Sequence, residues 1–458
     1  MSMWKQSEGG AERTAVPTLG APIRAGRIYA PLTASLLYLG GTFALFIAIG
    51  EVALVPSLFD LVSFVLLTLV ALTVGYVLKI RSYDREERLI LVRTVNSREE
   101  RRKTERLVVI SAVYLAVYGL ALLVAFGATG ISDVIDSIIH PGLSYADKFQ
   151  IFEAQKAEDT KNLLIQILTL LSVLYTPLVP LTIVYGKRLK RRVRVMAYLG
   201  VATYGISFLF IGTMKAFGDL FAFTLAGLGV LTFGLWPRNS RGGLSKRGVA
   251  ATVTLLCVVF VGYMAINQSE RMTIFGNEDL FEPNPIVAAV TGEDFARGIA
   301  AVAFYPTHGY LGLAYNLETP FAWSGGKGSS RALDSYWVQY LGAGSAFEST
   351  YPARTEVRTG WPALRVWATA YPWFASDLSF PGTIILMGLV GSFLARTWFE
   401  AAFERSQLAL LLFCQFVLFI AYIPANNQIG SSRTSLIAFV SLVLLYATSR
   451  LRSRRLAQ

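Results

Sequence analysis

Eight basic side chains stand at or near one end of the membrane spans that this sequence predicts, and their chemistry suits phosphate binding. Lys215 lies in the short turn of "FIGTMKAFGDLFAF", and Arg433 follows the polar run "PANNQIGSS". Cations held where water is partly excluded can grip a diphosphate, and they stabilise it as a leaving group without a metal. The alternative is that each side chain reaches lipid headgroups from a helix end. The other six are Arg297, Lys327, Arg331, Arg354, Arg358 and Arg365.

Acids and aromatic residues between the same predicted spans suggest a site that handles sugars. Aromatic faces beside hydroxyls suit a sugar ring, although a packed loop core would use the same residues. The aromatic residues are Tyr310, Tyr315, Phe321, Trp323, Tyr336, Trp337 and Tyr340. A base that deprotonates an attacking hydroxyl must lie within hydrogen-bond distance of it, and the sequence does not give that distance. The candidate bases are Glu318, Asp334, Glu348, Glu356, Asp377 and His308.

Several other chemistries have no matching motif. The sequence has no GxxxxGK[ST] loop, no dinucleotide fingerprint and no HExxH. Its two histidines, His140 and His308, make a histidine-based metal site improbable. Cys257 and Cys414 both fall in apolar runs and give no disulfide framework. We therefore predict no metal and no cofactor.

Composition indicates what kind of scaffold positions these residues. Hydrophobic residues make up 54% of the chain, charged residues 16%, and the mean hydropathy is +0.50. Apolar runs long enough to cross a bilayer core of about 30 Å recur along the chain. We predict an all-α polytopic membrane protein with about ten spans, at 28–50, 56–79, 107–127, 163–186, 195–213, 219–236, 248–267, 379–396, 407–424 and 433–449.

The charges of the connecting segments predict the orientation. Residues 79–106 hold ten Lys and Arg, residues 187–194 six, residues 238–247 four, and the C-terminal nine residues four more. On the other side, residues 268–378 hold seven Lys and Arg against eleven Asp and Glu. By the positive-inside rule both termini are cytoplasmic, so the net charge of +12 reflects orientation and not nucleic-acid binding. The interleaved charges of 79–106 either extend helices into the cytoplasm or contact anionic lipid.

The chain therefore divides into a cytoplasmic tail (1–27), seven spans (28–267), a large periplasmic loop domain (268–378), three spans (379–450) and a second cytoplasmic tail (451–458). The loop domain carries five of the eight tryptophans, which argues against disorder. Within it, 284–306 and 360–378 are expected to form short amphipathic helices on the membrane surface. Asp60 is the clearest acid inside a span, and such scarcity disfavours a proton- or ion-coupled transporter.

This arrangement resembles the Wzy-type polymerases of oligosaccharide repeat units, which are integral-membrane, GT-C-like glycosyltransferases. The resemblance rests on the layout of spans, the Gly-Thr-x-Lys turn ending at Lys215, and "DLSFPGTIILMGLVGSFLAR" after the loop. In that segment Asp377, Phe380 and Gly382 form an Asp-x-x-Phe-x-Gly pattern.

The resemblance implies metal-independent polymerisation of undecaprenyl-diphosphate-linked repeat units, as in O-antigen synthesis, at the outer face of the bacterial inner membrane. It implies that Lys215, Arg331 and Arg433 grip the diphosphate, with Lys327, Arg354, Arg358 and Trp323 also contacting substrate. Glu348 or His308 would activate the acceptor. The expected partners are membrane lipids, with a chain-length regulator and a flippase of the same pathway. A glycan ligase, a lipid-linked oligosaccharide flippase or other transporter, and a non-enzymatic assembly protein stay open as alternatives.

Overall fold

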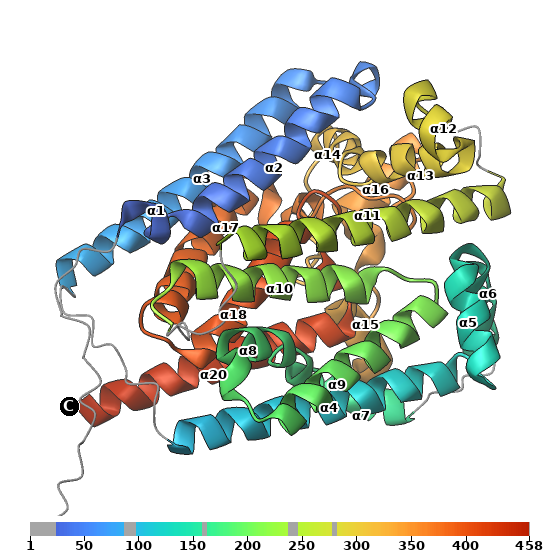
Figure 1. Cartoon of the computed structure of the whole chain (residues 1–458). Coiled ribbons are helices and arrows are strands. Elements are labelled where there is room, and N and C mark those ends of the chain that lie inside the picture. Colours follow the sequence, from blue (N-terminus) through green and yellow to red (C-terminus); the bar gives the residue numbers. More distant parts are fainter. Residues whose placement is uncertain (1–23, 87–97, 158–162, 237–245, 277–281, 458) are drawn as a thin grey trace, which may run out of the picture.

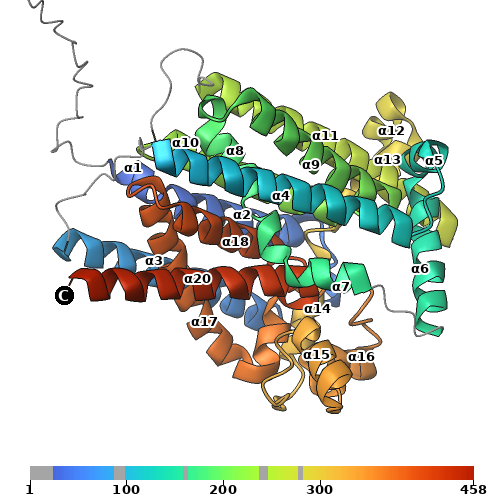
Figure 2. The same cartoon turned by 90° about the horizontal axis from the view of Figure 1, so that it is seen from below.

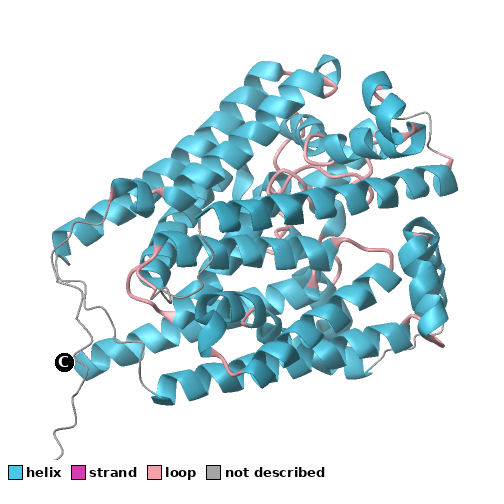
Figure 3. Cartoon of the chain, viewed as in Figure 1, coloured by secondary structure: helices cyan, strands magenta, loops and turns pink. Residues whose placement is uncertain are grey.

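The computed structural model describes residues 24–86, 98–157, 163–236, 246–276 and 282–457. Most of these residues lie in helices, and no β-strand occurs among them (Figure 3). Most of the N-terminal tail and the middle of the basic segment 79–106 lie outside the described residues.

The predicted class, an all-α polytopic membrane protein, is confirmed. Eight described helices are long and apolar enough to cross a bilayer. They are α2 (Ala30–Ile49), α3 (Leu58–Glu86), α4 (Arg98–Ala125), α9 (Arg191–Phe210), α10 (Lys215–Phe233), α11 (Lys246–Phe275), α17 (Tyr371–Ala402) and α20 (Arg433–Ala457). Many of their leucines are exposed, such as Leu37, Leu66 and Leu444, as expected of a surface that contacts lipid.

Two of the ten predicted spans differ from the other eight. The predicted span 163–186 forms α7 (Leu163–Leu170), the 3-10 turn η2 (Ser172–Tyr175) and α8 (Leu178–Tyr185), and the two parts are bent by 67°. The break between the two parts lies at Leu171, and Pro177 comes later, at the N-cap of α8, where it has no N–H to donate. The predicted span 407–424 forms α18 (Gln407–Tyr422), which has only 16 residues and is mostly buried by other helices.

Close packing between the spans depends on glycines. A Cβ at Gly391 of α17 would lie 2.1 Å from the carbonyl oxygen of Leu72 on α3, and one at Gly75 would lie 1.8 Å from that of Gly388. Gly119 and Gly200 make similar approaches between α4 and α9. Small residues at these positions let helix backbones touch, as they commonly do in membranes.

The start of the described chain and its C-terminal end lie at the same end of the bundle (Figure 1). There α1 (Ala25–Ile28) is held by Tyr76 and Trp398, whose side chains donate to the carbonyls of Ile28 and Arg27. We call this end the basic end, because the predicted cytoplasmic segments adjoin it. The shared end agrees with the predicted topology, while the side of the membrane stays a prediction.

Most of the shorter helices gather away from the basic end, at what we call the loop-domain end (Figures 1 and 2). They are α5 (Ile131–Ile139), α6 (Pro141–Ala157), α12 (Pro285–Thr291), α13 (Glu293–Phe304), α14 (His308–Leu317), α15 (Arg331–Leu341), η5 (Phe347–Ser349), α16 (Tyr351–Thr359) and α19 (Gln428–Ser431).

The structure corrects one predicted element of the loop domain. The segment 284–306 does form two short helices, α12 and α13, but 360–378 does not form a separate surface helix. Its first half is turns, and from Tyr371 it is the buried start of α17. This start is separated from the rest of α17 by a break at Ser379, where φ is 63° and ψ is 167°, two residues before Pro381. Burial of Tyr371 and Trp373 thus determines where this segment lies, and its amphipathic pattern does not.

Candidate functional site

Lys215 lies at the loop-domain end and is paired with an acid that the sequence analysis did not use. Its Nζ lies 2.6 Å from the Oδ2 of Asp219, one helical turn further along α10, and 3.2 Å from the Oγ of Ser435 on α20. The Asp219 side chain is fully buried and also accepts from the Tyr422 hydroxyl. Because this carboxylate compensates its charge, Lys215 is a weaker ligand for a diphosphate than its sequence position suggested.

Polar side chains from the bent element meet the same part of α20. Ser172 in η2 donates to the carbonyl of Thr434, and Gln415 of α18 donates to Thr176, between η2 and α8. All three of Ser172, Thr176 and Gln415 are fully buried. A buried polar cluster therefore lies beside the Lys215–Asp219 pair, and the spacing of four residues in "KAFGD" was the available signal for Asp219.

Arg433 reaches from the start of α20 to α15 in the loop domain. Its Nε donates to the Oγ of Ser335 at 3.0 Å, and its guanidinium carbon lies 4.7 Å from the centre of the Tyr336 ring. Arg331 precedes Ser335 by four residues, so both lie on one face of α15. Among the described residues, neither guanidinium has a carboxylate within ion-pair distance. The structure thus places Arg433 against Ser335, one turn of α15 after Arg331, and neither arginine has an acid at ion-pair distance among the described residues.

The glycine-rich segment 324–330 is folded around Asp377, which lies just before the break in α17. The carboxylate accepts from the Ser324 hydroxyl, from the backbone and hydroxyl of Ser329, and from the backbone N–H of Gly328. Gly325 and Gly326 have φ near +75°, which favours glycine. Asp377, a candidate base from sequence, is therefore committed to holding this segment.

Lys327 and Arg331 line one small cavity, together with Asp334, Phe347 and Trp373. The carboxylate of Asp334, a candidate base from sequence, accepts from the Ser345 hydroxyl and the Ala346 N–H. The Nζ of Lys327 donates to the carbonyl of Gly344 at 2.9 Å, just after the end of α15. A shared substrate site of Lys327 and Arg331 stays a prediction.

Arg354 and Arg358 on α16 make hydrogen bonds to the backbone near the end of α14. Arg354 donates to the carbonyl of Pro320, and Arg358 donates to the carbonyls of Tyr315 and Glu318. These carbonyls follow or end α14, where cations stabilise the partial negative charge of a helix C-terminus. Both arginines thus have structural contacts that the sequence could not show.

The burial of His308 argues against its predicted role as the base that activates the acceptor. Its ring stacks on Phe304 and Trp367, and its Nε2 accepts from the backbone N–H of Trp367. Burial lowers the pKa of His308 from 6.5 to about 4, so the neutral ring is strongly favoured. Because the ring is 6% exposed and bonded to backbone, it has no path to a substrate hydroxyl.

The other candidate base, Glu348, is exposed on η5, and Trp323 is exposed in the loop before Ser324. Tyr310, a predicted sugar-stacking residue, is instead buried against α2, where its hydroxyl bonds that of Thr42. The helix α14 that carries Tyr310 is thus a core helix, and Tyr310 does not face a glycan site. Within the described chain, no cluster of three His, Cys, Asp or Glu side chains is placed to hold a metal ion.

Fold and site together define an integral membrane protein of many helices, with a cationic cluster at the loop-domain end. No family model matches this chain, and no curated protein or solved structure is found to match it.

Proposed function

We propose that this chain polymerises oligosaccharide repeat units carried on undecaprenyl diphosphate, at the outer face of the bacterial inner membrane. The main support is the pair Arg331 and Arg433, two cations without acid partners in the described chain. They are 102 residues apart in the sequence, and both lie at one face of α15. The same helix also exposes the apolar side chains Leu333, Trp337 and Leu341. Cations beside exposed apolar and aromatic groups suit an amphiphile with a phosphate head.

In the proposed reaction an acceptor hydroxyl attacks the anomeric carbon of a lipid-linked glycan. The new glycosidic bond forms as the bond from that carbon to the diphosphate oxygen breaks, and the bonding electrons leave with the diphosphate. Arg331 and Arg433 stabilise the developing negative charge, with Lys327 beside them, so that no metal is required. The hydroxyl proton goes to a base that we leave unassigned, because His308 is enclosed.

The proposed setting includes membrane lipids and, in the same pathway, a flippase and a regulator of chain length. The GT-C-like class and the cytoplasmic termini belong to the same proposal. All of them rest on the resemblance in layout and on the charge distribution of the loops.

The test is a strain that lacks this gene, complemented with wild-type or variant chains, with the surface glycan resolved by size. If polymerisation is the function, deletion removes the long ladder and leaves single repeat units attached to their acceptor. Arg433→Ala and Arg331→Ala are expected to reproduce that pattern, because each leaves the diphosphate with one guanidinium. Arg365→Ala is the matched control, since Arg365 is exposed in the same domain. An unchanged ladder after deletion refutes the glycan function.

The bent element α7–α8 supports a second candidate, a flippase for lipid-linked oligosaccharides. Interrupted helices that expose backbone near buried polar groups are common in transporters, and Asp219 lies in such a cluster. A flippase or a ligase would give a different deletion phenotype, in which no repeat units reach the surface acceptor. Accumulation of lipid-linked units on the cytoplasmic side would favour the flippase over the ligase.

A further inference from the structure

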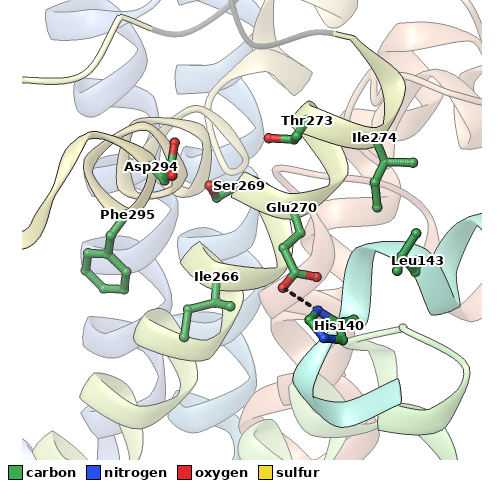
Figure 4. A pocket seen from close by; sticks show the side chains of 9 residues that line it. All are labelled: His140, Leu143, Ile266, Ser269, Glu270, Thr273, Ile274, Asp294 and Phe295. Atoms are coloured by element: carbon green, nitrogen blue, oxygen red, sulfur yellow. Dashed lines mark ion pairs between the residues drawn. The ribbon is translucent and has the colours of Figure 1, made fainter. Parts of the chain in front are cut away.

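A groove runs along α11, and neither Arg331 nor Arg433 is among the residues that line it (Figure 4). Its volume is about 450 Å³, within the range of roughly 300–1,000 Å³ that is usual for small-ligand sites. The floor is one face of α11, with side chains spaced at intervals of three and four residues. The floor residues are Ile266, Ser269, Glu270, Thr273 and Ile274.

Two neighbouring helices form the walls. His140 and Leu143, at the α5–α6 junction and on α6, line one side, and Asp294 and Phe295 of α13 line the other (Figure 4). Both walls approach α11 through a glycine. A Cβ at Gly142 would lie 2.7 Å from the Cβ of Glu270, and one at Gly298 would lie 2.2 Å from the carbonyl oxygen of Ala265.

Glu270 is held in a defined position in the groove. Its Oε2 accepts from the backbone N–H of Gly142 at 2.9 Å, and its Oε1 lies 3.9 Å from the Nδ1 of His140. The side chain is 28% exposed, so one oxygen is fixed while the carboxylate still faces the groove. A carboxylate fixed in this way is a strong acceptor for a ligand hydroxyl.

The charged side chains that line the groove do not favour a phosphate ligand. Glu270 and Asp294 line it, Asp294 is paired with Arg297 at 3.2 Å, and no Lys or Arg is itself a lining residue. Five lining side chains are polar and four are apolar, and the polar ones occur on successive turns of α11 and on both walls. A saccharide carries hydroxyls along its whole length and apolar faces on its rings, so it matches this alternation. A lipid with a single ammonium group would use only one of these positions.

Exposed apolar residues flank the groove and indicate that it opens near the bilayer surface. Ile131, Ile135 and Ile139 form a stripe along α5 and are 81%, 50% and 56% exposed. Ile286 and Val290 on α12 are 77% and 82% exposed. Short helices with such faces lie in the membrane interface, where the sugar part of a lipid-linked substrate is located.

We propose that this groove binds sugar residues of the lipid-linked glycan, holding the chain while the diphosphate is gripped elsewhere. The proposal rests on the proposed function, since it names the part of the substrate that the groove receives. Glu270 and Thr273 bond hydroxyls, and Phe295 and Ile266 contact ring faces. The groove is a binding site and takes no part in bond breaking.

Binding is measured on the full chain in lipid nanodiscs, by calorimetry. The probe is an oligosaccharide of one to three repeat units, prepared by partial acid hydrolysis of the surface polysaccharide of the same organism. The wild-type chain binds the probe, and Glu270→Gln weakens binding about tenfold or more, as expected for loss of a charge-assisted hydrogen bond. Thr273→Val, which keeps the side-chain shape, weakens it several-fold. Asp136→Asn, a change at an exposed acid of α5 outside the groove, leaves binding unchanged.

Absence of binding to the wild-type chain, or equal binding by wild type and both groove variants, overturns the proposal. The proposal is also overturned if vesicles of an ammonium-bearing phospholipid displace the probe and the two groove variants change binding of the phospholipid but not of the oligosaccharide. The surface-glycan gel separates this failure from failure of the proposed function. If deletion removes the ladder but Glu270→Gln leaves its length unchanged, the groove proposal alone is refuted. If deletion leaves the ladder unaffected, the proposed polymerisation is refuted.

Discussion

The pairing of Lys215 with Asp219 predicts a specific pattern of stability changes. Lys215→Met leaves a fully buried carboxylate with only the Tyr422 hydroxyl as partner. Removing one member of a buried ion pair costs about 3–5 kcal/mol. With an unfolding entropy of roughly 2 cal/mol/K per residue, a chain of 458 residues gives about 1 kcal/mol/K, so Tm falls by ~3–5 °C.

The assay is thermal unfolding of the purified chain in one detergent, for the two single variants and the double variant. Asp219→Leu should lower Tm by a similar amount, because it leaves Lys215 without its acid. The combination Lys215→Met with Asp219→Leu should recover most of the loss, since no buried charge is then left uncompensated. Additive losses in the double variant would refute the pair as an energetic unit. Recovered stability without a recovered glycan ladder would show that Lys215 also has a functional role.

Three further changes test other parts of the structure. Burial disfavours the protonated ring of His308 and lowers its pKa from 6.5 to about 4. The difference corresponds to about 3 kcal/mol of folding stability, which is fully present above pH 6.5. This stability is lost as the pH falls from 6.5 towards 4, and a Tm measured across that range should fall less in His308→Phe than in wild type. Asp377→Ala removes four hydrogen bonds from segment 324–330 and lowers its local stability by about 3 kcal/mol. We expect faster amide exchange in this segment and unchanged exchange in α3. Gly391→Leu would place a side chain against the Leu72 carbonyl and lower Tm by several degrees, whereas Gly40→Leu, with open space at its Cβ, should not; equal effects would contradict the close packing of α3 and α17.

Hydropathy predicted most of the fold because lipid-facing helices must be apolar over a fixed length. It could not distinguish a straight span from the bent α7–α8 element, since both are equally apolar. It also placed α18 correctly as a helix, although its 16 residues are buried by neighbours and not by lipid. Composition measures apolarity, whereas the position and angle of a bend depend on contacts in the folded chain, such as that of Ser172 with the Thr434 carbonyl.

The candidate site was predictable in part. Arg331, Arg433 and Lys327 do lie beside α15, because polar residues next to span ends must collect at one end of the bundle. The roles of Arg354, Arg358 and Asp377 were not predictable, since each is committed to backbone groups that only the folded chain brings near. His140 and Glu270 are 130 residues apart, and neither one carries a local motif that would have marked the groove.

The break at Ser379 joins two parts of the molecule that respond to different surroundings. The segment before it carries Asp377 and so holds 324–330, while the segment after it is embedded among apolar helices. A helix in a bilayer adjusts its tilt when its apolar length and the thickness of the hydrocarbon layer do not match. A change in the tilt of α17 after Ser379 would therefore reach the glycine-rich segment through the hydrogen bonds of Asp377.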